Sequence, residues 1–248
     1  MIKPIKVTGK CNEALVYAKA IEANCKDKIR QYLGHPAFAD TAVRIMPDVH
    51  LGKGTVAGFT AACNSLIIPS VIGVDIGCGV CACNLGRGNL RFDKLDVFIR
   101  KNIPSGTAVR GSIHERLADM VSFTGESGGG GDTGRFKRSI RELCDKQGYS
   151  PERVFAALGT LGGGNHFIEI DRDENHNRWL LIHSGSRIPG KRTAEYHEII
   201  ALRETEAESP LKYLSGSFAD DYRSDMAVVQ RYARINRALM ATVIRSGV

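Results

Sequence analysis

The chain has 248 residues, which suffices for one or two domains with a sizeable hydrophobic core. Its composition, 43% hydrophobic and 25% charged, is typical of a globular protein, and the lack of any long apolar run excludes a membrane-spanning helix. The formal net charge of +7 favours an anionic partner such as nucleic acid or nucleotide, although many basic proteins bind neither.

The N-terminal part of the sequence predicts a cytoplasmic protein that begins with a helix. The first residues, MIKPIKVTGK, lack the apolar core of a signal peptide. In the cytoplasm the seven cysteines would be thiols or metal ligands. Apolar residues at helical spacing predict a helix over residues 13–33, with Asn12 as its N-cap and Gly34 and Pro36 at its end. The segment AVRIM, residues 42–46, predicts a strand.

The middle of the chain predicts two buried strands, a helix and a loop. Residues 65–76 and 79–85 are β-branched and apolar, so we expect strands on either side of Gly77. Residues 92–103 predict a helix. Residues 124–135, TGESGGGGDTGR, predict a flexible loop, which is either ordered by a ligand or a plain surface linker.

The C-terminal part predicts a strand pair and a long helix. FIEI (residues 167–170) and WLLIHSGS (residues 179–186) read as paired strands around a polar turn. Residues 220–245 predict a helix with one apolar face, and its arginines Arg231, Arg234 and Arg237 fit a solvated face.

Four segments combine glycine with residues that bind metals or move protons. They are PDVHLGKG (residues 47–54), GVDIGCG (73–79), LGGGNHFIE (161–169) and HSGSR (183–187). Glycines let the backbone approach a ligand closely, and successive amide N–H groups can bind an anion.

The second of these segments contains a candidate metal-binding pair. Asp75 and Cys78 are three residues apart in a glycine turn, so both can face one cation. His166 and His183 each lie beside a predicted strand end and would complete a set of oxygen, sulfur and nitrogen ligands. Such a set suits zinc, manganese, iron or cobalt. Taken singly, a histidine in a strand is more often a core residue, and a cysteine in an apolar strand is usually a small hydrophobic residue.

Other interpretations of these segments have weaker support. Cys81 and Cys83 continue an apolar run and fit core residues, and the Cys78-x-x-Cys81 spacing lacks the helix start of a thioredoxin-like redox site. GTLGGGNH lacks the Lys-Ser/Thr end of a P-loop. HSGSR offers hydroxyl groups and a guanidinium to an anion, but this segment does not form the G-x-S-x-G elbow of a hydrolase.

Taken together, the four segments resemble the RtcB family of RNA ligases. The matching strings, in order, are MPDVHLGKG, VIGVDIGCGV, LGTLGGGNHFIEI and LIHSGSR, and the later AVVQRYARINRALM is similar to a helical segment of the family. The resemblance implies an α+β fold with a large mixed β-sheet and flanking helices. It also implies a single RtcB-like domain over residues 1–248 that lacks the family's C-terminal segment.

The resemblance implies an activity and its cofactors. The family joins RNA that ends in a 3′-phosphate or 2′,3′-cyclic phosphate to RNA that begins with a 5′-hydroxyl. It uses GTP and divalent metal, usually two manganese ions. A histidine is guanylylated, GMP passes to the RNA 3′-phosphate, and the 5′-hydroxyl then displaces GMP. RNA and GTP are therefore the expected partners, with an archease-like activator or a complementing C-terminal chain, and no membrane.

The resemblance also assigns roles to individual residues. The implied metal ligands are Asp75, Cys78, His166 and His183, with the Cys78 thiolate bridging two ions. Asn165 would contact the GTP phosphates and Glu169 the guanine, so both are expected to bind the cofactor. Arg187 would bind a phosphate of RNA or nucleotide, and Asp48 would lie near the same centre.

The sequence departs from the family pattern in its C-terminal part. The guanylylated histidine and its glycine-rich context follow the position of Arg245 in the family, and no such segment is found in these 248 residues. We therefore assign no catalytic nucleophile and expect no guanylylation of this chain alone. The competing interpretations are a shortened RNA ligase, one half of a split ligase, and an inactive protein that binds metal, nucleotide or RNA.

Overall fold

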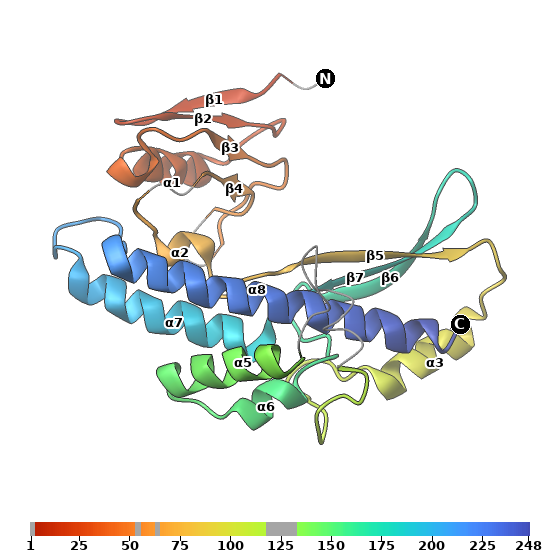
Figure 1. Ribbon diagram of the computed structural model, residues 1–248. Helices are drawn as coiled ribbons and strands as arrows, with labels where there is room; N and C mark the ends of the chain where they lie inside the picture. The colour runs from red at the N-terminus through yellow and green to blue at the C-terminus, as the bar shows by residue number, and fades with distance from the viewer. Residues whose placement is uncertain (1–2, 53–55, 63–64, 118–132) are drawn as a thin grey trace. The chain divides into compact units, whose positions relative to one another are not determined.

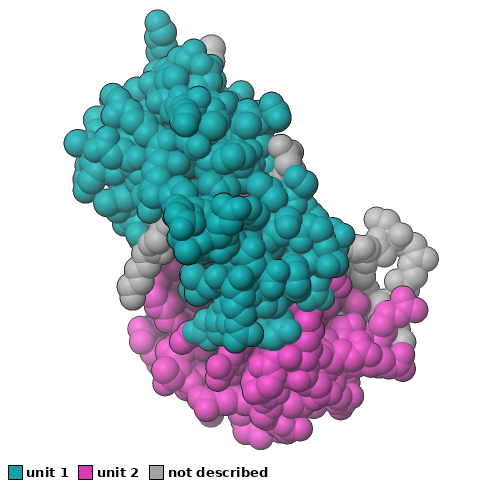
Figure 2. Space-filling view, turned by 90° about the vertical axis from the view of Figure 1, so that its left-hand side faces the viewer, with its two compact units in different colours: residues 1–74, 194–223 teal, residues 75–193, 224–248 magenta. Residues whose placement is uncertain are grey.

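A computed structural model describes residues 3–52, 56–62, 65–117 and 133–248 (Figure 1). The chain divides into two compact units, which Figure 2 distinguishes by colour. The first unit comprises residues 1–74 and 194–223, and the second comprises residues 75–193 and 224–248. The expectation of a single domain over residues 1–248 stays a prediction.

A 4-stranded sheet with the order β1-β2-β3-β4 forms the basis of the first unit. Its strands are β1 (Ile5–Thr8), β2 (Glu13–Val16), β3 (Val43–Ile45) and β4 (Phe59–Thr60). β2 pairs antiparallel with β1 and parallel with β3, so the sheet is mixed. Helix α1 (Ala23–Leu33) contributes Ile29, Tyr32 and Leu33 to the core of this unit, and the short helix η1 (Pro36–Phe38) follows it.

The helix predicted over residues 13–33 is correct only from Ala23 onward. Ala14, Val16 and Ala18 are buried in alternation, and this period of two is that of a strand. Asn12 is no N-cap, because its Nδ2 donates to the carbonyl of Thr41 at 2.8 Å and its Oδ1 accepts from the amide of the first β2 residue. The predicted helix end at residue 34 is confirmed.

The strand predicted over residues 65–76 is wrong. Residues 69–72 form the short helix α2 (Pro69–Ile72), which begins with a proline at a position where no amide donor is needed. Before it, Ile67 makes an isolated antiparallel bridge with Leu214. The β-branched composition therefore reflects burial of Ile67 and Ile68 rather than a regular strand.

The second unit contains a 3-stranded antiparallel sheet with the order β5-β7-β6. Its strands are β5 (Gly79–Gly86), β6 (Phe167–Arg172) and β7 (Arg178–Ser184), and they confirm the strands predicted at these places. Helix α3 (Phe92–Asn102) and the long helix α8 (Gly216–Arg245) are also confirmed. One face of the sheet packs on residues of α3 and α8, and Leu180, Ile182 and Met240 are completely buried there.

A second core of this unit lies between α5 (Thr133–Gln147), α6 (Pro151–Ala156) and α8. Phe136, Ile140 and Phe155 pack there against Tyr232 and Leu239. Residues 133–135 of the predicted glycine-rich loop begin α5, and residues 124–132 lie outside the described residues. Helix α7 (Arg187–Glu204), which follows β7 after a short turn, was not predicted from the sequence.

The fold is mixed α and β, as expected for an α+β protein. The described residues form two small sheets rather than the large mixed sheet that the resemblance implied. Across residues 3–52, 56–62, 65–117 and 133–248, no helix is both long and apolar enough to cross a membrane. The cytoplasmic location stays a prediction.

Candidate metal centre

Three segments of the second unit meet at one end of the β5-β7-β6 sheet. Cys78 directly precedes β5, His166 directly precedes β6, and His183 is the penultimate residue of β7. Because β7 runs antiparallel to both neighbours, the starts of β5 and β6 lie beside its end. Strand topology thus gathers residues that are far apart in the sequence.

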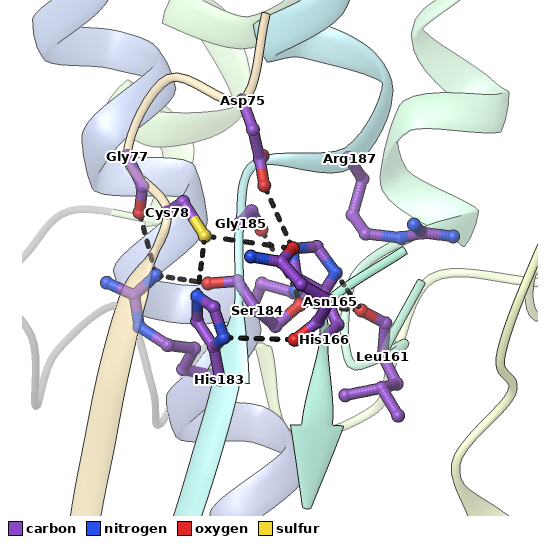
Figure 3. Close-up of polar contacts among 12 residues, drawn as sticks. Asp75, Gly77, Cys78, Leu161, Asn165, His166, His183, Ser184, Gly185 and Arg187 are labelled. Carbon is purple, nitrogen blue, oxygen red and sulfur yellow. Dashed lines mark hydrogen bonds and ion pairs between the residues drawn. The ribbon is translucent and has the colours of Figure 1, made fainter. Parts of the chain in front are cut away.

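The side chains of the four predicted ligands converge at this end of the sheet (Figure 3). His166 Nε2 lies 2.9 Å from Asp75 Oδ2 and 3.7 Å from the sulfur of Cys78. His183 Nε2 lies 3.0 Å from the same sulfur. The ligand atoms of Asp75, Cys78 and His166 all lie within 4.8 Å of one another, a spacing suited to ligands around one ion.

Backbone carbonyls hold both imidazole rings in a fixed orientation. His166 Nδ1 lies 2.9 Å from the carbonyl oxygen of Leu161, and His183 Nδ1 lies 3.2 Å from that of Asn165. A carbonyl only accepts hydrogen bonds, so each Nδ1 carries the proton and donates it. The Nε2 atoms are then the metal-binding atoms: that of His166 faces Asp75 and Cys78, and that of His183 faces Cys78. Metal-ligating histidines typically have this arrangement.

The donor set fits a divalent cation. Two imidazole nitrogens, a carboxylate and a sulfur atom converge there, and each of them can donate an electron pair to a cation. A mixture of oxygen, nitrogen and sulfur ligands suits manganese, iron, cobalt or zinc better than magnesium. Asp75, Cys78, His166 and His183 are therefore the residues that would hold the ion.

The surroundings of Cys78 disfavour the thiolate form of its side chain. Its burial, and then the neighbouring Asp75 carboxylate, raise the pKa of this thiol to about 12, while the Arg237 guanidinium acts in the opposite direction. A bound cation would favour the thiolate, because metal coordination deprotonates a thiol.

Two motif glycines are required by the close approach of these side chains. A Cβ at Gly185 would lie 1.9 Å from Asp75 Oδ1. Gly162 has a φ of +91°, and a Cβ there would lie 2.1 Å from Nη1 of Arg187 and 2.8 Å from Nδ1 of His166. Glycine at both positions lets the backbone pass directly behind the candidate ligands.

Comparison with known proteins identifies the family of this chain. The profile of the family described as tRNA-splicing ligase RtcB matches residues 35–248. The chain belongs to the RtcB family. It is 31% identical over 245 residues to RNA-splicing ligase RtcB of Escherichia coli K12, and this match covers 90% of the chain and 57% of the relative.

Archaeal members of the RtcB family are similar over slightly less of the chain. The identity is 28% to tRNA-splicing ligase RtcB of Archaeoglobus fulgidus and 27% to that of Thermococcus kodakarensis. Each match covers 81% of this chain and 50% of the relative. The chain thus spans about half the length of the curated relatives it matches.

Arg187, for which the RtcB resemblance implies a phosphate contact, lies beside the centre with two of its nitrogens engaged. Its Nε donates to Thr160 Oγ1 at 3.1 Å and its Nη2 donates to the carbonyl of Gly106 at 2.8 Å. Arg187 also has a φ of +57°, and burial lowers the pKa of its guanidinium. The phosphate contact stays a prediction.

Asn165 and Glu169 lie on the side of the sheet opposite to its apolar core. The register places Phe167 opposite His183, and Glu169 is two residues further along β6 on the same exposed face. The side chain of Asn165 lies among the candidate ligands in Figure 3. Their predicted contacts with nucleotide remain predictions.

Asp48 belongs to the first unit, and its predicted place near the centre stays a prediction. Its carbonyl lies 2.6 Å from Nδ1 of His50, which is part of the same motif. Residues 53 and 54 of this motif lie outside the described residues.

Two residues that contact the motif loops were missed in the sequence. Arg237 was interpreted as part of a solvated arginine row, but it is half-buried and donates to the carbonyls of Gly77 and Ser184. Its neighbour Asn236 is completely buried. The burial of Asn236 could have been inferred from the sequence. The residues three and four positions before and after it are Tyr232, Ala233, Leu239 and Met240, so its amide lies on the apolar face of the helix.

Proposed function

We propose that this chain supplies the metal- and nucleotide-binding part of an RNA ligase. The ligase joins RNA 3′-phosphate or 2′,3′-cyclic phosphate ends to 5′-hydroxyl ends, with GTP and two manganese ions as cofactors and a guanylylated histidine as intermediate. The observation that carries this proposal is the convergence of Asp75, Cys78, His166 and His183 in a member of the RtcB family.

In the proposed centre, the protein residues bind the ions and orient the ligand atoms. Joining phosphate ends requires neutralised phosphate oxygens and aligned reacting groups. When bound, the manganese ions would supply that neutralisation. The carbonyls of Leu161 and Asn165 keep the Nε2 atoms of His166 and His183 directed at the ion site. The sulfur of Cys78 favours manganese over magnesium.

The exposed sheet face next to the centre supports a guanine site. The carboxylate of Glu169 can accept two hydrogen bonds, which matches the two N–H groups on one edge of guanine. The ring of Phe167 is 37% exposed on this face, and its centroid lies 5.2 Å from that of His183. A purine ring that packs on Phe167 would place its phosphates toward Asn165 and the metal ligands.

The basic character of the chain supports RNA as the polymeric substrate. A net charge of +7 attracts a phosphate backbone, and binding of this kind weakens as salt rises. Arg187 would orient the terminal phosphate, because a guanidinium matches phosphate geometry. An archease-like activator and a complementing C-terminal chain are the further partners that this proposal expects.

Nucleotide binding tests the guanine site. We expect the chain, with manganese present, to bind GTP more tightly than ATP in isothermal titration calorimetry. Glu169→Gln should abolish this preference and leave manganese affinity unchanged. Asp171→Asn, two residues further along the same face of β6, is the matched control and should retain the preference. Equal affinities for GTP and ATP in the parent chain would contradict the proposed site.

RNA binding distinguishes the ligase from the binding protein. We expect manganese-dependent binding to favour RNA that ends in a 3′-phosphate over RNA that ends in a 3′-hydroxyl, and His183→Ala to remove the difference. A second assay measures joining of 3′-phosphate and 5′-hydroxyl ends with GTP and manganese, with a complementing C-terminal chain added. Binding without joining in that mixture would favour an inactive RNA-binding protein.

A further inference from the structure

Arg237 on α8 ties together two of the motif turns from the buried side. Its Nη1 donates to the carbonyl of Gly77 at 2.8 Å and to the carbonyl of Ser184 at 2.7 Å. Gly77 directly precedes Cys78, and Ser184 directly follows His183. One guanidinium therefore fixes the backbone beside both residues whose side chains meet at 3.0 Å.

The turn that carries Cys78 lies directly on α8. Gly77 has a φ of +81°, and a Cβ there would lie 3.0 Å from Ala233 Cβ and from Gln230 Cα. A Cβ at Gly79 would lie 3.6 Å from Nη2 of Arg237. Cys78 is thus held between two glycines that contact the helix and its arginine.

Asn236, the preceding residue of α8, holds the remaining turns. Its Oδ1 accepts hydrogen bonds from the amides of Gly159 at 2.8 Å and Thr160 at 3.1 Å. Its Nδ2 lies 3.1 Å from the carbonyl of Thr160 and 3.2 Å from both Ser184 Oγ and the carbonyl of Gly185. Ser184 Oγ in turn donates to the carbonyl of Leu161, the group that also holds His166.

We propose that Asn236 and Arg237 are positioning residues of the metal centre, which fix from behind the backbone turns that carry Cys78, His166 and His183. The inference rests on the proposed metal centre but assigns these two residues no contact with metal or substrate. Their hydrogen bonds end on backbone groups and on one buried hydroxyl, so they act through the geometry of the turns.

The charge and shape of Arg237 suit this role. The Nη1 group of the planar guanidinium carries two N–H donors in fixed directions, one for each carbonyl, whereas the donors of an ammonium group rotate freely. The carbonyl oxygens of Gly77 and Ser184 each accept a hydrogen bond from the arginine, which brings no competing ligand to the centre.

The test measures manganese affinity and metal-free stability separately in the 248-residue chain. Manganese binding is followed by the loss of the free-ion signal in electron paramagnetic resonance, and stability by the thermal unfolding midpoint without metal. We compare Arg237→Met, Arg237→Lys and the control Arg245→Met, which changes an exposed arginine near the end of the same helix.

We expect Arg237→Met to weaken manganese affinity about 10- to 100-fold, the usual effect of losing a group that orients metal ligands. Arg237→Lys should recover part of this affinity, because it retains a cationic donor near the two carbonyls. Arg245→Met should match the parent. If Arg237→Met does not fold, the manganese affinity of Arg237→Lys tests the inference instead. The inference then requires this affinity to be lower than that of the parent.

Three results would overturn the inference. If Arg237→Met lowers only the unfolding midpoint and the folded protein keeps the parent affinity, Arg237 is merely structural. If both Arg237 variants bind manganese like the parent, the positioning role is wrong and the metal centre stands. If the parent itself binds no manganese while it is folded, the proposed centre fails and this inference fails with it.

Discussion

The two faces of the β5-β7-β6 sheet are made by alternate residues of the same strands but differ in what they contact. On one face, Cys81 and Ile182 pack against the core that α3 and α8 complete. On the other face, Val80, His183 and Phe167 lie opposite one another in register, and Val80 is 56% exposed. The apolar face fixes the strands, and the exposed face presents the candidate site.

This difference explains why the candidate ligands lie where the strands end. A ligand within the apolar face would have to displace core side chains, whereas the loops before β5 and β6 leave that core without disturbing it. Cys78 lies three residues before Cys81, the first cysteine of the apolar face, and Cys78 is exposed to solvent whereas Cys81 is only partly exposed. The free energy of unfolding and the metal affinity should therefore respond to substitutions on different faces.

The largest effect is expected on the apolar face. Ile182→Ala should lower the free energy of unfolding by about 3 kcal/mol, because it opens a cavity among fully buried neighbours. Val80→Ala, on the neighbouring strand but exposed, should change it by less than about 0.5 kcal/mol. Urea unfolding of both variants measures the contrast. Similar losses for the two would mean that the faces are not distinct.

The next largest effect is expected at the glycine behind Asp75. Gly185→Ala should weaken manganese affinity about 100-fold, because the added Cβ would lie 1.9 Å from Asp75 Oδ1 and displace the carboxylate. Gly88→Ala, where a Cβ meets no atom within 4 Å, is the matched control. Titration of both variants with manganese decides. Unchanged affinity in Gly185→Ala would exclude Asp75 as a ligand.

A smaller effect is expected from pH. Because the pKa of the Cys78 thiol is raised to about 12, the metal-free thiol stays protonated from pH 6 to pH 9, and metal binding must release its proton. This thiol alone makes manganese affinity rise roughly tenfold per pH unit over that range. Cys78→Ala should bind more weakly and with a shallower pH dependence, whereas Cys81→Ser should keep the slope of the parent.

The smallest effect is expected at the far end of the sheet. Hydrogen bonds from Trp179 and Asn177 lower the pKa of Asp173 to about 2. A carboxylate with a lowered pKa stabilises the folded state at pH values above its usual pKa of 3.8. This stabilisation is lost as the pH falls toward about 2. The fluorescence of Trp179, the single tryptophan, should stay constant down to about pH 4 and change below it.

Asp173→Asn serves as the control for this acid transition. It should remove the part of the fluorescence change that comes from protonation of the carboxylate. An unaltered fluorescence profile in Asp173→Asn would show that other groups govern the acid response of the turn.

The sequence predicted the elements of the second unit better than those of the first. β6, β7 and α8 have clear periodicity or length, so local pattern and tertiary structure agree. The apolar residues around β2 fit both the period of a helix and the period of two of a strand. This segment forms a strand because it pairs with β1 and β3. Local pattern carries no information about such partners.

The residues of the candidate site also differ in how well the sequence predicted them. The glycine-rich motifs marked Asp75, Cys78, His166 and His183, because unusual residue types at short spacing are visible in a sequence. Arg237 was misread, because a helical arginine looks the same whether it points to solvent or to buried carbonyls. Whether such an arginine is exposed depends on which elements pack against its helix, and this is known only from the folded structure.

A cobalt titration of the 248-residue chain tests the central claim most directly. Cobalt(II) bound by a thiolate gives an intense charge-transfer absorption in the near ultraviolet, and cobalt belongs to the ions that this ligand set suits. We expect this absorption in the parent chain, its loss in Cys78→Ala, and its retention in Cys81→Ala. A parent chain without the absorption, or a Cys78→Ala variant that keeps it, would contradict the assignment of Cys78 to a metal centre.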